Sequence, residues 1–341
     1  MSIDQEKSTK SDNRFRFLKA QDIIPKDDTH HGNIKLLDIE WWYFDAIFDD
    51  GYSVQIGFRI YHIKKIGIVQ SRINIYKDGK SVSEKLKVDF VSNFKVDKEY
   101  PNISLNKKRV VQFDEGFYKN NNRWKYRIKL SIKDSSIDLI FIGNTVGWKI
   151  ETADTCWTVP LPKALVEGNI VVNGKEIKVK GVGYHDHNWS YSPTTAMNNF
   201  GWFWGRIGAG SLTITWAKVI HNKDDIDILA VINKDEHGYY NINPDKIKIQ
   251  SKNYQMVNRG RIPKDFILRI NDNTTNDVDI NCQIEMNTLD IQYTRIFTIK
   301  YWRYHVKTNG SIAVGNFSES IKDKPQIIEY LKFKSKDLNK K

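Results

Sequence analysis

Apolar and polar residues alternate with a period of two along most of the chain. Apolar side chains occupy every second position over 124–132 and again over 137–141, on either side of a Lys-Asp-Ser-Ser turn. Successive side chains of an extended strand point to opposite faces, so this alternation predicts a β-hairpin with one buried face. The same pattern predicts strands at 54–62, 211–220, 226–233, 279–287, 291–306 and 311–317.

Two tighter hairpins are marked by Asn173-Gly174 and Asp78-Gly79, each placed between strand-like segments. Both residues of such a pair tolerate positive φ, which a two-residue type I′ turn requires. Long amphipathic helices are hard to find, and only the segments 242–257 and 320–332 suggest short ones. Repeated strands separated by turn residues favour an all-β antiparallel barrel or sandwich.

The length of 341 residues suffices for one large domain or two ordinary ones that each bury a core. The least patterned polar stretch in mid-chain, residues 190–200, marks the expected boundary. We therefore expect a polar N-terminal tail over 1–28, β domains over 29–192 and 193–335, and a frayed tail over 336–341.

Composition narrows the class of protein. With 40% hydrophobic and 12% aromatic residues, the chain is not of the disordered type. Its two cysteines, Cys156 and Cys282, are too few for a disulfide framework or a cysteine-rich zinc site. No apolar run approaches the ~20 residues of a membrane-spanning helix, and the first residues lack the apolar core of a secretory signal. We expect a soluble, cytoplasmic protein.

The net charge of +12 raises the question of an acidic partner. A basic chain rich in aromatics is compatible with nucleic-acid binding. The lysines, however, are scattered singly among Ile and Asn and form no basic motif. We therefore expect no nucleic-acid partner and interpret the lysines as solvent-exposed residues on the outward faces of the strands. Peripheral contact with anionic membranes is the remaining possibility.

The tryptophans are unevenly distributed. Seven of the ten lie in five short segments: Trp41, Trp42, Trp157, Trp189, Trp202, Trp204 and Trp216. In the extended segment 40–45, adjacent side chains point to opposite faces, so Trp41 and Trp42 cannot share one. Aromatic residues on both faces indicate that neither face is plain solvent.

The run Gly-Tyr-His-Asp-His-Asn-Trp at 183–189 is the richest in chemical groups. If it is extended, Tyr184, Asp186 and Asn188 share one face and align a phenol, a carboxyl and an amide. In an apolar pocket, desolvation would raise the pKa of Asp186 and keep it protonated, as a general acid requires. Residue types alone equally allow Tyr184 and Asp186 merely to satisfy the hydrogen bonds of a strand edge.

The other face of this run carries His185 and His187, which could begin a metal site. A zinc site needs three or four ligands, and the candidates for a third show no diagnostic spacing. These candidates are Glu40, His62 and His221. We interpret the two histidines as structural groups that bond neighbouring loops, and we expect no metal.

A third segment, Gly-Trp-Phe-Trp-Gly-Arg at 201–206, places Trp202, Trp204 and Arg206 on one face if it is extended. An arginine beside indoles can bind an anionic or carbonyl group, or pair with a buried carboxylate such as Glu40 or Asp186. The motifs of serine hydrolases, P-loop proteins, dinucleotide-binding folds and zinc peptidases are all missing from the sequence.

The segments 40–51, 156–189 and 200–207 occur in an order that resembles the lipocalin-like superfamily of hydroxyneurosporene synthase (carotenoid 1,2-hydratase) and AttH-like proteins. Lipocalin-like Diels-Alderases belong to the same wider group. The resemblance implies two consecutive lipocalin-like antiparallel β-barrel or sandwich domains with few short helices, and an apolar pocket. Tyr184 and Asp186 match the Tyr-x-Asp pattern of the hydratases, whereas Ser190 stands where many AttH-like proteins carry Gly.

The resemblance also implies an activity. We expect an enzyme without metal or organic cofactor, of hydro-lyase or isomerase type, that acts on a hydrophobic isoprenoid- or polyketide-like molecule by proton-initiated hydration, cyclisation or isomerisation. Asp186 would deliver the proton and Tyr184 would polarise or relay it. The expected substrate-binding residues are Trp42, Trp157, Asn188, Trp202, Trp204 and Arg206. The alternative is a non-catalytic lipocalin-like carrier of a hydrophobic ligand.

Overall fold

The computed structural model describes residues 18–32, 37–63, 66–152, 155–191, 199–258, 260–275, 277–296 and 299–333. Strands dominate these residues. The helices among them are α1 (Glu115–Asn121) and the short 3-10 helices η2 (Pro25–Asp28), η3 (Val91–Asn93) and η4 (Pro244–Lys246). None of these helices is long and apolar enough to cross a membrane.

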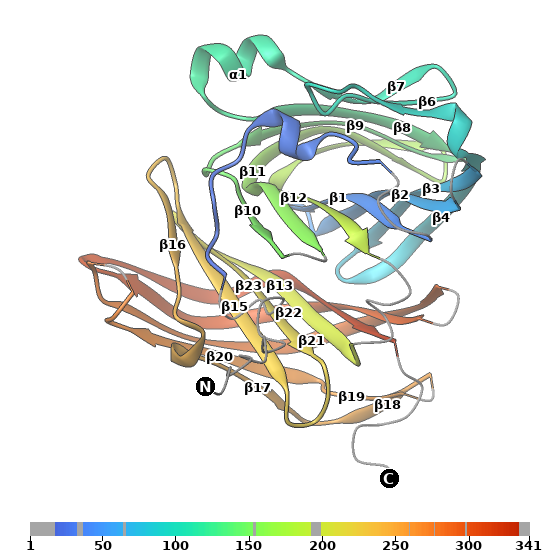
Figure 1. Ribbon diagram of the computed structural model, residues 1–341. Helices are drawn as coiled ribbons and strands as arrows, with labels where there is room; N and C mark the ends of the chain where they lie inside the picture. Colours follow the sequence, from blue (N-terminus) through green and yellow to red (C-terminus); the bar gives the residue numbers. More distant parts are fainter. Residues whose placement is uncertain are drawn as a thin grey trace, which may run out of the picture.

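The first sheet has twelve strands and curls into a nearly closed barrel (Figure 1). Its antiparallel order is β4-β3-β2-β1-β12-β11-β9-β8-β7-β6-β5, with β10 paired to β11. The strands are β1 (Ile39–Phe48), β2 (Tyr52–Ile63), β3 (Ile66–Lys77), β4 (Lys80–Phe90), β5 (Phe94–Val96), β6 (Ile103–Leu105), β7 (Lys108–Phe113), β8 (Lys125–Ile132), β9 (Ser135–Gly143), β10 (Trp148–Glu151), β11 (Cys156–Val172) and β12 (Lys175–Tyr191).

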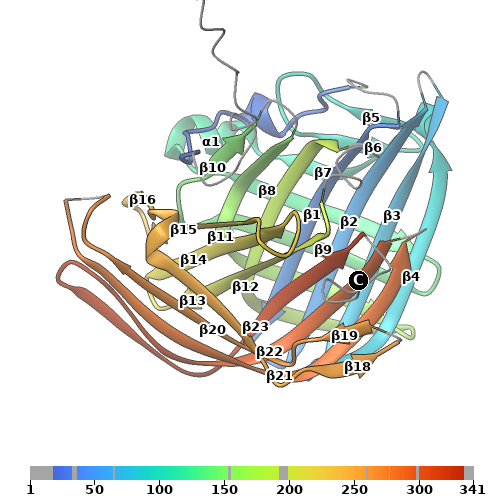
Figure 2. The same ribbon diagram turned by 60° about the horizontal axis from the view of Figure 1, so that its bottom comes forward.

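The second sheet has nine strands in the order β16-β15-β14-β13-β23-β22-β21-β20-β17 and forms an open half-barrel (Figure 2). Its strands are β13 (Gly201–Ala209), β14 (Leu212–Ile220), β15 (Ile226–Lys234), β16 (Gly238–Asn241), β17 (Ile247–Lys252), β20 (Asp265–Asp272), β21 (Ile280–Ile296), β22 (Ile299–Val314) and β23 (Phe317–Lys332). A separate hairpin joins β18 (Gln255–Val257) to β19 (Gly260–Ile262).

Three apolar clusters account for most of the buried aromatic and aliphatic side chains. One fills the first barrel and includes Trp42 and Phe44, and a second lines the half-barrel around Trp216 and Trp302. A third cluster lies between the two sheets, where Tyr184 of β12 meets side chains of β13, β14 and β15. The outer face of β1 and β12 is therefore covered by the second sheet.

The all-β prediction with two lipocalin-like units is confirmed, and so are its turns. Asn173 and Gly174 have φ of 52° and 77°, and Asp78 and Gly79 have φ of 50° and 81°. The chain passes from the first sheet to the second between β12 and β13, within the stretch where the boundary is predicted. Residues 192–198 of that stretch lie outside the described residues.

The predicted short helices are wrong. The segment 242–257 contains only the short η4, followed by the strands β17 and β18, and 320–332 belongs to β23. Residues 326–332 are buried without interruption, because β23 is covered on both faces. A strand buried on both faces loses its alternation, and its sequence then cannot be told from a buried helix.

Two other expectations about chain segments need correction. The predicted strand 291–306 is divided between β21 and β22, which form a hairpin. Residues 18–28, expected in the polar tail, are packed against the sheets: Gln21 pairs with Lys149 of β10, and η2 crosses the opening of the first barrel (Figure 1). Asp28 is fully buried there, so a residue of the expected tail belongs to the barrel interior. Residues 1–17 and the expected tail 336–341 lie outside the described residues.

Candidate functional site

The predicted face of Tyr184, Asp186 and Asn188 is present on β12 and lies against the second sheet. The Tyr184 hydroxyl donates to Asp186 Oδ2 over 3.0 Å, and the Asn188 amide donates to Asp186 Oδ1 over 3.1 Å. The indole Nε1 of Trp157, on the neighbouring β11, donates to Asp186 Oδ2 over 3.0 Å. Three of the predicted site residues therefore converge on the carboxyl group of a fourth.

Glycine at position 183 allows β12 to pack closely at this point. A Cβ atom on Gly183 would lie 2.6 Å from both Phe141 Cε1 and Val166 Cγ2, and 2.8 Å from the Asp45 carbonyl oxygen. Real Cβ atoms do not approach other atoms so closely, so a larger residue would push β12 away from β1 and the barrel core. Gly183 thus helps to position the neighbouring Tyr184.

Aromatic rings surround the carboxyl group. The ring of Trp204, from β13, stacks on Tyr184 with centroids 5.2 Å apart, and it meets Tyr43 edge-on at 5.4 Å. The indole of Trp157 meets Trp148 edge-on at 5.3 Å. The faces of such rings carry partial negative charge and attract cations. Asp186 therefore lies in an apolar layer in which a transient positive charge would be stabilised.

Burial raises the pKa of Asp186 to about 8. The hydrogen bonds from Trp157 and Tyr184 oppose this rise because they favour the charged form, and the nearby carboxylates Glu329 and Asp45 add to it. Asp186 is consequently protonated at neutral pH, while three donors already point at its oxygens. This combination suits a group that gives up a proton and must then hold the negative charge.

Buried ion pairs lie beside this cluster. Arg206 donates through Nε to Asp45 Oδ1 over 3.0 Å, and its guanidinium carbon lies 6.0 Å from the centroid of the Tyr184 ring. The predicted alternative that Arg206 pairs with a buried carboxylate is confirmed, but the partner is Asp45 and not Glu40 or Asp186. The error has a simple cause, because which carboxylate of the first sheet faces β13 depends on how the two sheets pack.

A second buried pair joins Arg303 of β22 to Glu329 of β23. Arg303 also donates to the Tyr43 hydroxyl over 2.6 Å, and the indole of Trp204 donates to Glu329 Oε2 over 3.0 Å. Sequence reasoning missed Arg303, Glu329, Tyr43 and Asp45 as members of this region. A usable signal was present, since Arg303 and Glu329 are charged residues inside otherwise apolar runs.

The predicted aromatic residues do not all reach Asp186. Trp42 lies on the other face of β1, inside the first barrel, where its indole donates to the Asp28 carbonyl oxygen over 2.9 Å. Trp202 packs edge-on against Tyr191 and Phe333, with ring centroids 5.5 and 4.8 Å away. Trp157 and Trp204 are thus the two predicted tryptophans nearest to the Asp186 carboxyl group.

The two histidines of the run lie on the face opposite Tyr184 and Asp186, as the alternation predicts, and this face points into the barrel. His185 bonds Asp28 Oδ2 through Nε2 over 2.9 Å, and His187 bonds Glu40 Oε1 through Nε2 over 2.9 Å. The Tyr126 hydroxyl donates to the same Asp28 oxygen over 2.7 Å. Burial by itself would raise the pKa of Asp28, but its interactions with the histidines outweigh this and lower the pKa to about 2.

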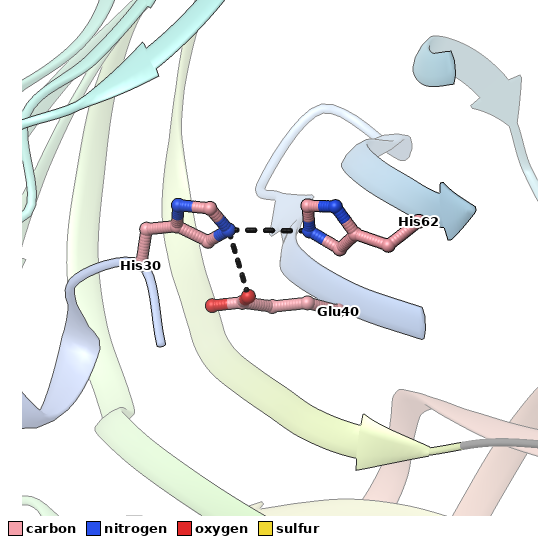
Figure 3. Close-up of side chains that lie close together, drawn as sticks. All are labelled: His30, Glu40 and His62. Carbon is pink, nitrogen blue, oxygen red and sulfur yellow. Dashed lines mark hydrogen bonds and ion pairs between the residues drawn. The ribbon is translucent and has the colours of Figure 1, made fainter. Parts of the chain in front are cut away.

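One group of residues has the composition and spacing of metal ligands. His30, Glu40 and His62 place one ligand atom each within 4.8 Å of one another (Figure 3). Glu40 and His62 were considered in the sequence as third ligands beside His185 and His187. The structure joins them instead to His30, which lies two residues beyond the expected tail 1–28. Burial lowers the pKa of His62, so its imidazole is neutral near pH 7.

Comparison with known proteins identifies the fold of this chain. No protein-family profile matches the chain. An AttH-like protein from Nitrosomonas europaea has a TM-score of 0.61 at 16% identity, over 92% of this chain and 97% of that one. The chain has the AttH-like fold. CghA, solved with Sch210972, has a TM-score of 0.55 at 11% identity, over 94% of this chain and 97% of its own.

Two further proteins extend this comparison. Kievitone hydratase from Nectria haematococca shares the AttH-like fold with a TM-score of 0.54 at 11% identity, covering 86% of this chain and 88% of its own. In sequence, the quinolone epoxide rearrangement protein asqO from Emericella nidulans is 32% identical over 59 residues. That match spans 17% of this chain and 16% of asqO. The predicted resemblance is therefore confirmed at the level of the AttH-like fold.

Proposed function

We propose that this protein is an enzyme that protonates an alkene of a hydrophobic isoprenoid- or polyketide-like molecule and so starts its hydration, cyclisation or isomerisation. The observation that carries this proposal is the state of Asp186. This carboxyl group is 4% exposed, has a pKa of about 8 and is surrounded by aromatic rings. A protonated carboxyl group in apolar surroundings has the acidity that general acid catalysis needs near neutral pH.

The proton transfer leaves a charge on each partner. The proton of Asp186 forms a new C–H bond with one alkene carbon, and the other carbon becomes a tertiary carbocation. The carboxylate left on Asp186 is held by the hydrogen bonds from Trp157, Tyr184 and Asn188. These donors are in place before the reaction, so no reorganisation is needed when the charge develops.

The carbocation is resolved by one of three routes. Addition of water and return of the water proton to Asp186 give a tertiary alcohol. Attack by an internal alkene forms a ring and moves the positive charge to the other carbon of that alkene, and loss of a proton from its neighbour to Asp186 then leaves a new double bond. Direct loss of a neighbouring proton from the first carbocation to Asp186 gives an isomer. The aromatic rings beside Asp186 attract a positive charge through their electron-rich faces. The guanidinium of Arg206 adds little repulsion because it is paired with Asp45.

The names of the related proteins agree with this chemistry. Kievitone hydratase has the same fold, and asqO, which matches a short part of the chain, is named for an epoxide rearrangement. Both reactions can be started by proton donation from a carboxyl group. A shared fold does not determine the reaction, so the proposal depends on the residues around Asp186.

Solvent deuterium provides the direct test. The purified protein is incubated in D2O with a panel of prenylated and polyene compounds that includes kievitone, and the products are analysed by mass spectrometry. We expect one product to carry deuterium at the protonated carbon. Asp186→Asn should abolish its formation, because the amide cannot supply the proton. Asp138→Asn, on the exposed face of β9, is the matched control and should leave turnover unchanged.

Two results would overturn the proposal. Turnover at the wild-type rate in Asp186→Asn would remove Asp186 from the chemistry. Tight binding of a panel compound that never incorporates deuterium would favour the non-catalytic carrier. Binding by both the wild type and Asp186→Asn, measured by quenching of tryptophan fluorescence, separates loss of chemistry from loss of the ligand site.

A further inference from the structure

A second cluster of reactive groups lies at one end of the first barrel, on the opposite side of β1 from Asp186. His30 follows η2, Glu40 lies on β1 and His62 lies on β2 (Figure 3). The Nε2 atoms of His30 and His62 are 3.3 Å apart, and His30 Nε2 is 3.3 Å from Glu40 Oε2. Glu40 and His62 are buried, and His30 is partly exposed.

Hydrogen bonds among these three side chains cannot satisfy all of their polar atoms. A neutral imidazole has a single N–H, so His30 Nε2 can donate to His62 or to Glu40 but not to both. Glu40 Oε2 is fully buried and accepts no hydrogen bond from any described residue. A buried carboxylate oxygen that accepts no hydrogen bond is costly, even with the His30 imidazole 3.3 Å away, and a cation bound between the three groups would satisfy all of them.

Two of the three distances between the ligand atoms match those of a tetrahedral metal site, and the third lies within 4.8 Å. Zinc binds imidazole nitrogen and carboxylate oxygen at about 2.0–2.2 Å, which places neighbouring ligand atoms of a tetrahedron about 3.3–3.6 Å apart. The two separations of 3.3 Å observed here agree with this value. Two histidines and one glutamate also form a known ligand set for zinc, with the fourth position left to water.

Neighbouring residues hold the glutamate in the required orientation. Glu40 Oε1 accepts from the His31 backbone N–H over 3.0 Å and interacts with His187 Nε2 at 2.9 Å. The second oxygen of Glu40 is thereby turned toward His30 and His62. Outer partners of this kind are usual for ligands in metal sites, because they fix the position of each ligand.

We propose that His30, Glu40 and His62 form a zinc site that ties the N-terminal segment 18–32 to β1 and β2 across the end of the first barrel. This site is separate from the Asp186 cluster, and its occupancy is measured without any substrate. With three ligands from the chain, a bound Zn2+ would take a water molecule as its fourth ligand. This proposal replaces the expectation, drawn from the sequence, that the chain binds no metal.

The test uses the full chain after removal of metals with a chelator. Zn2+ is titrated by isothermal calorimetry, and thermal unfolding is followed with and without Zn2+. We expect a single saturable site that raises the melting temperature. The variants His30→Asn, Glu40→Gln and His62→Asn should weaken Zn2+ binding by about 100-fold or more, since even loss of an outer partner costs roughly 10–100-fold. His237→Asn, at an exposed turn of the second sheet, is the matched control.

A second measurement tests whether Zn2+ holds the N-terminal segment 18–32 against β1 and β2. Zn2+ should slow tryptic cleavage after the exposed Lys26 in the wild type and in His237→Asn, and it should have no effect in His30→Asn. His30 is the variant best suited to this experiment because its side chain is 31% exposed, so its replacement disturbs the fold least. Absence of saturable Zn2+ binding, or equal affinity in His30→Asn and in the control, would overturn the proposal.

Discussion

Tyr184 and Asp186 lie two positions apart on β12, and the Tyr184 hydroxyl donates to the Asp186 carboxylate oxygen Oδ2 over 3.0 Å. Both point into the layer between the two sheets, while His185, between them in sequence, points into the barrel and bonds Asp28. One strand therefore serves two different environments. A group with a raised pKa lies on one face of β12 and a paired histidine on the other.

The raised pKa of Asp186 predicts a pH-dependent stability. Its folded pKa of about 8 lies above the value of about 3.9 for a free Asp, so folding favours the protonated form. The stability that depends on this proton is fully present below about pH 4 and is lost as pH rises through about 8. The side chain in Asp186→Asn is uncharged at every pH, so this variant does not lose stability as the pH rises through about 8.

We therefore expect the stability of Asp186→Asn relative to the wild type to improve between about pH 5 and about pH 9. Denaturant unfolding at the two pH values measures the difference. An unchanged difference would contradict the raised pKa. The rate of the proposed reaction should fall above about pH 8 in the wild type, because the acid form disappears.

The Arg303–Glu329 pair predicts a large effect on stability. Glu329→Gln leaves the buried guanidinium of Arg303 without a counter-charge, which costs about 3–5 kcal/mol of unfolding free energy. Asp138→Asn removes an exposed pair with Arg127 and should cost about 0–1 kcal/mol. Chemical denaturation measures the free energy of unfolding of both variants. Equal losses of unfolding free energy would contradict the burial of the Arg303–Glu329 pair.

At Ser190 we expect a substitution to stabilise the protein. Ser190 lies at a β-bulge, since two residues of β12 oppose Glu40 of β1, and it has a φ of 64°. Positive φ is costly for residues with a Cβ and free for glycine, so Ser190→Gly should gain about 1 kcal/mol of stability. Ser190→Ala keeps the strain and serves as the control. Equal melting temperatures for the Gly and Ala variants would refute this account.

At Gly183 we expect a substitution to destabilise the protein. Gly183→Ala places a methyl group 2.6 Å from side chains of β9 and β11, and overpacking of this kind costs about 1–3 kcal/mol. Gly208→Ala, on β13, is the control because its new methyl group would meet nothing closer than 3.9 Å. Unfolding experiments on the two variants should show a clear loss only for Gly183→Ala.

The separation of faces in 183–189 was predictable because strand geometry is local. Adjacent side chains of a strand must point to opposite sides, so Tyr184 and Asp186 had to share a face that His185 does not. The same argument placed Trp41 and Trp42 on different faces. It could not say that Trp42 lies inside the barrel, away from Asp186, because alternation does not reveal which face becomes the interior.

The sequence by itself determined the strands with clear alternation, the Asn173-Gly174 turn and the order of chemical groups along β12, since each depends on neighbouring residues only. Tertiary structure alone decided that Arg206 pairs with Asp45, that Glu329 lies beside Trp204, and that His30 meets Glu40 and His62. These contacts join residues far apart in the chain. They depend on how the sheets curve and pack, and on burial that makes an unpaired charge costly, which no local pattern encodes.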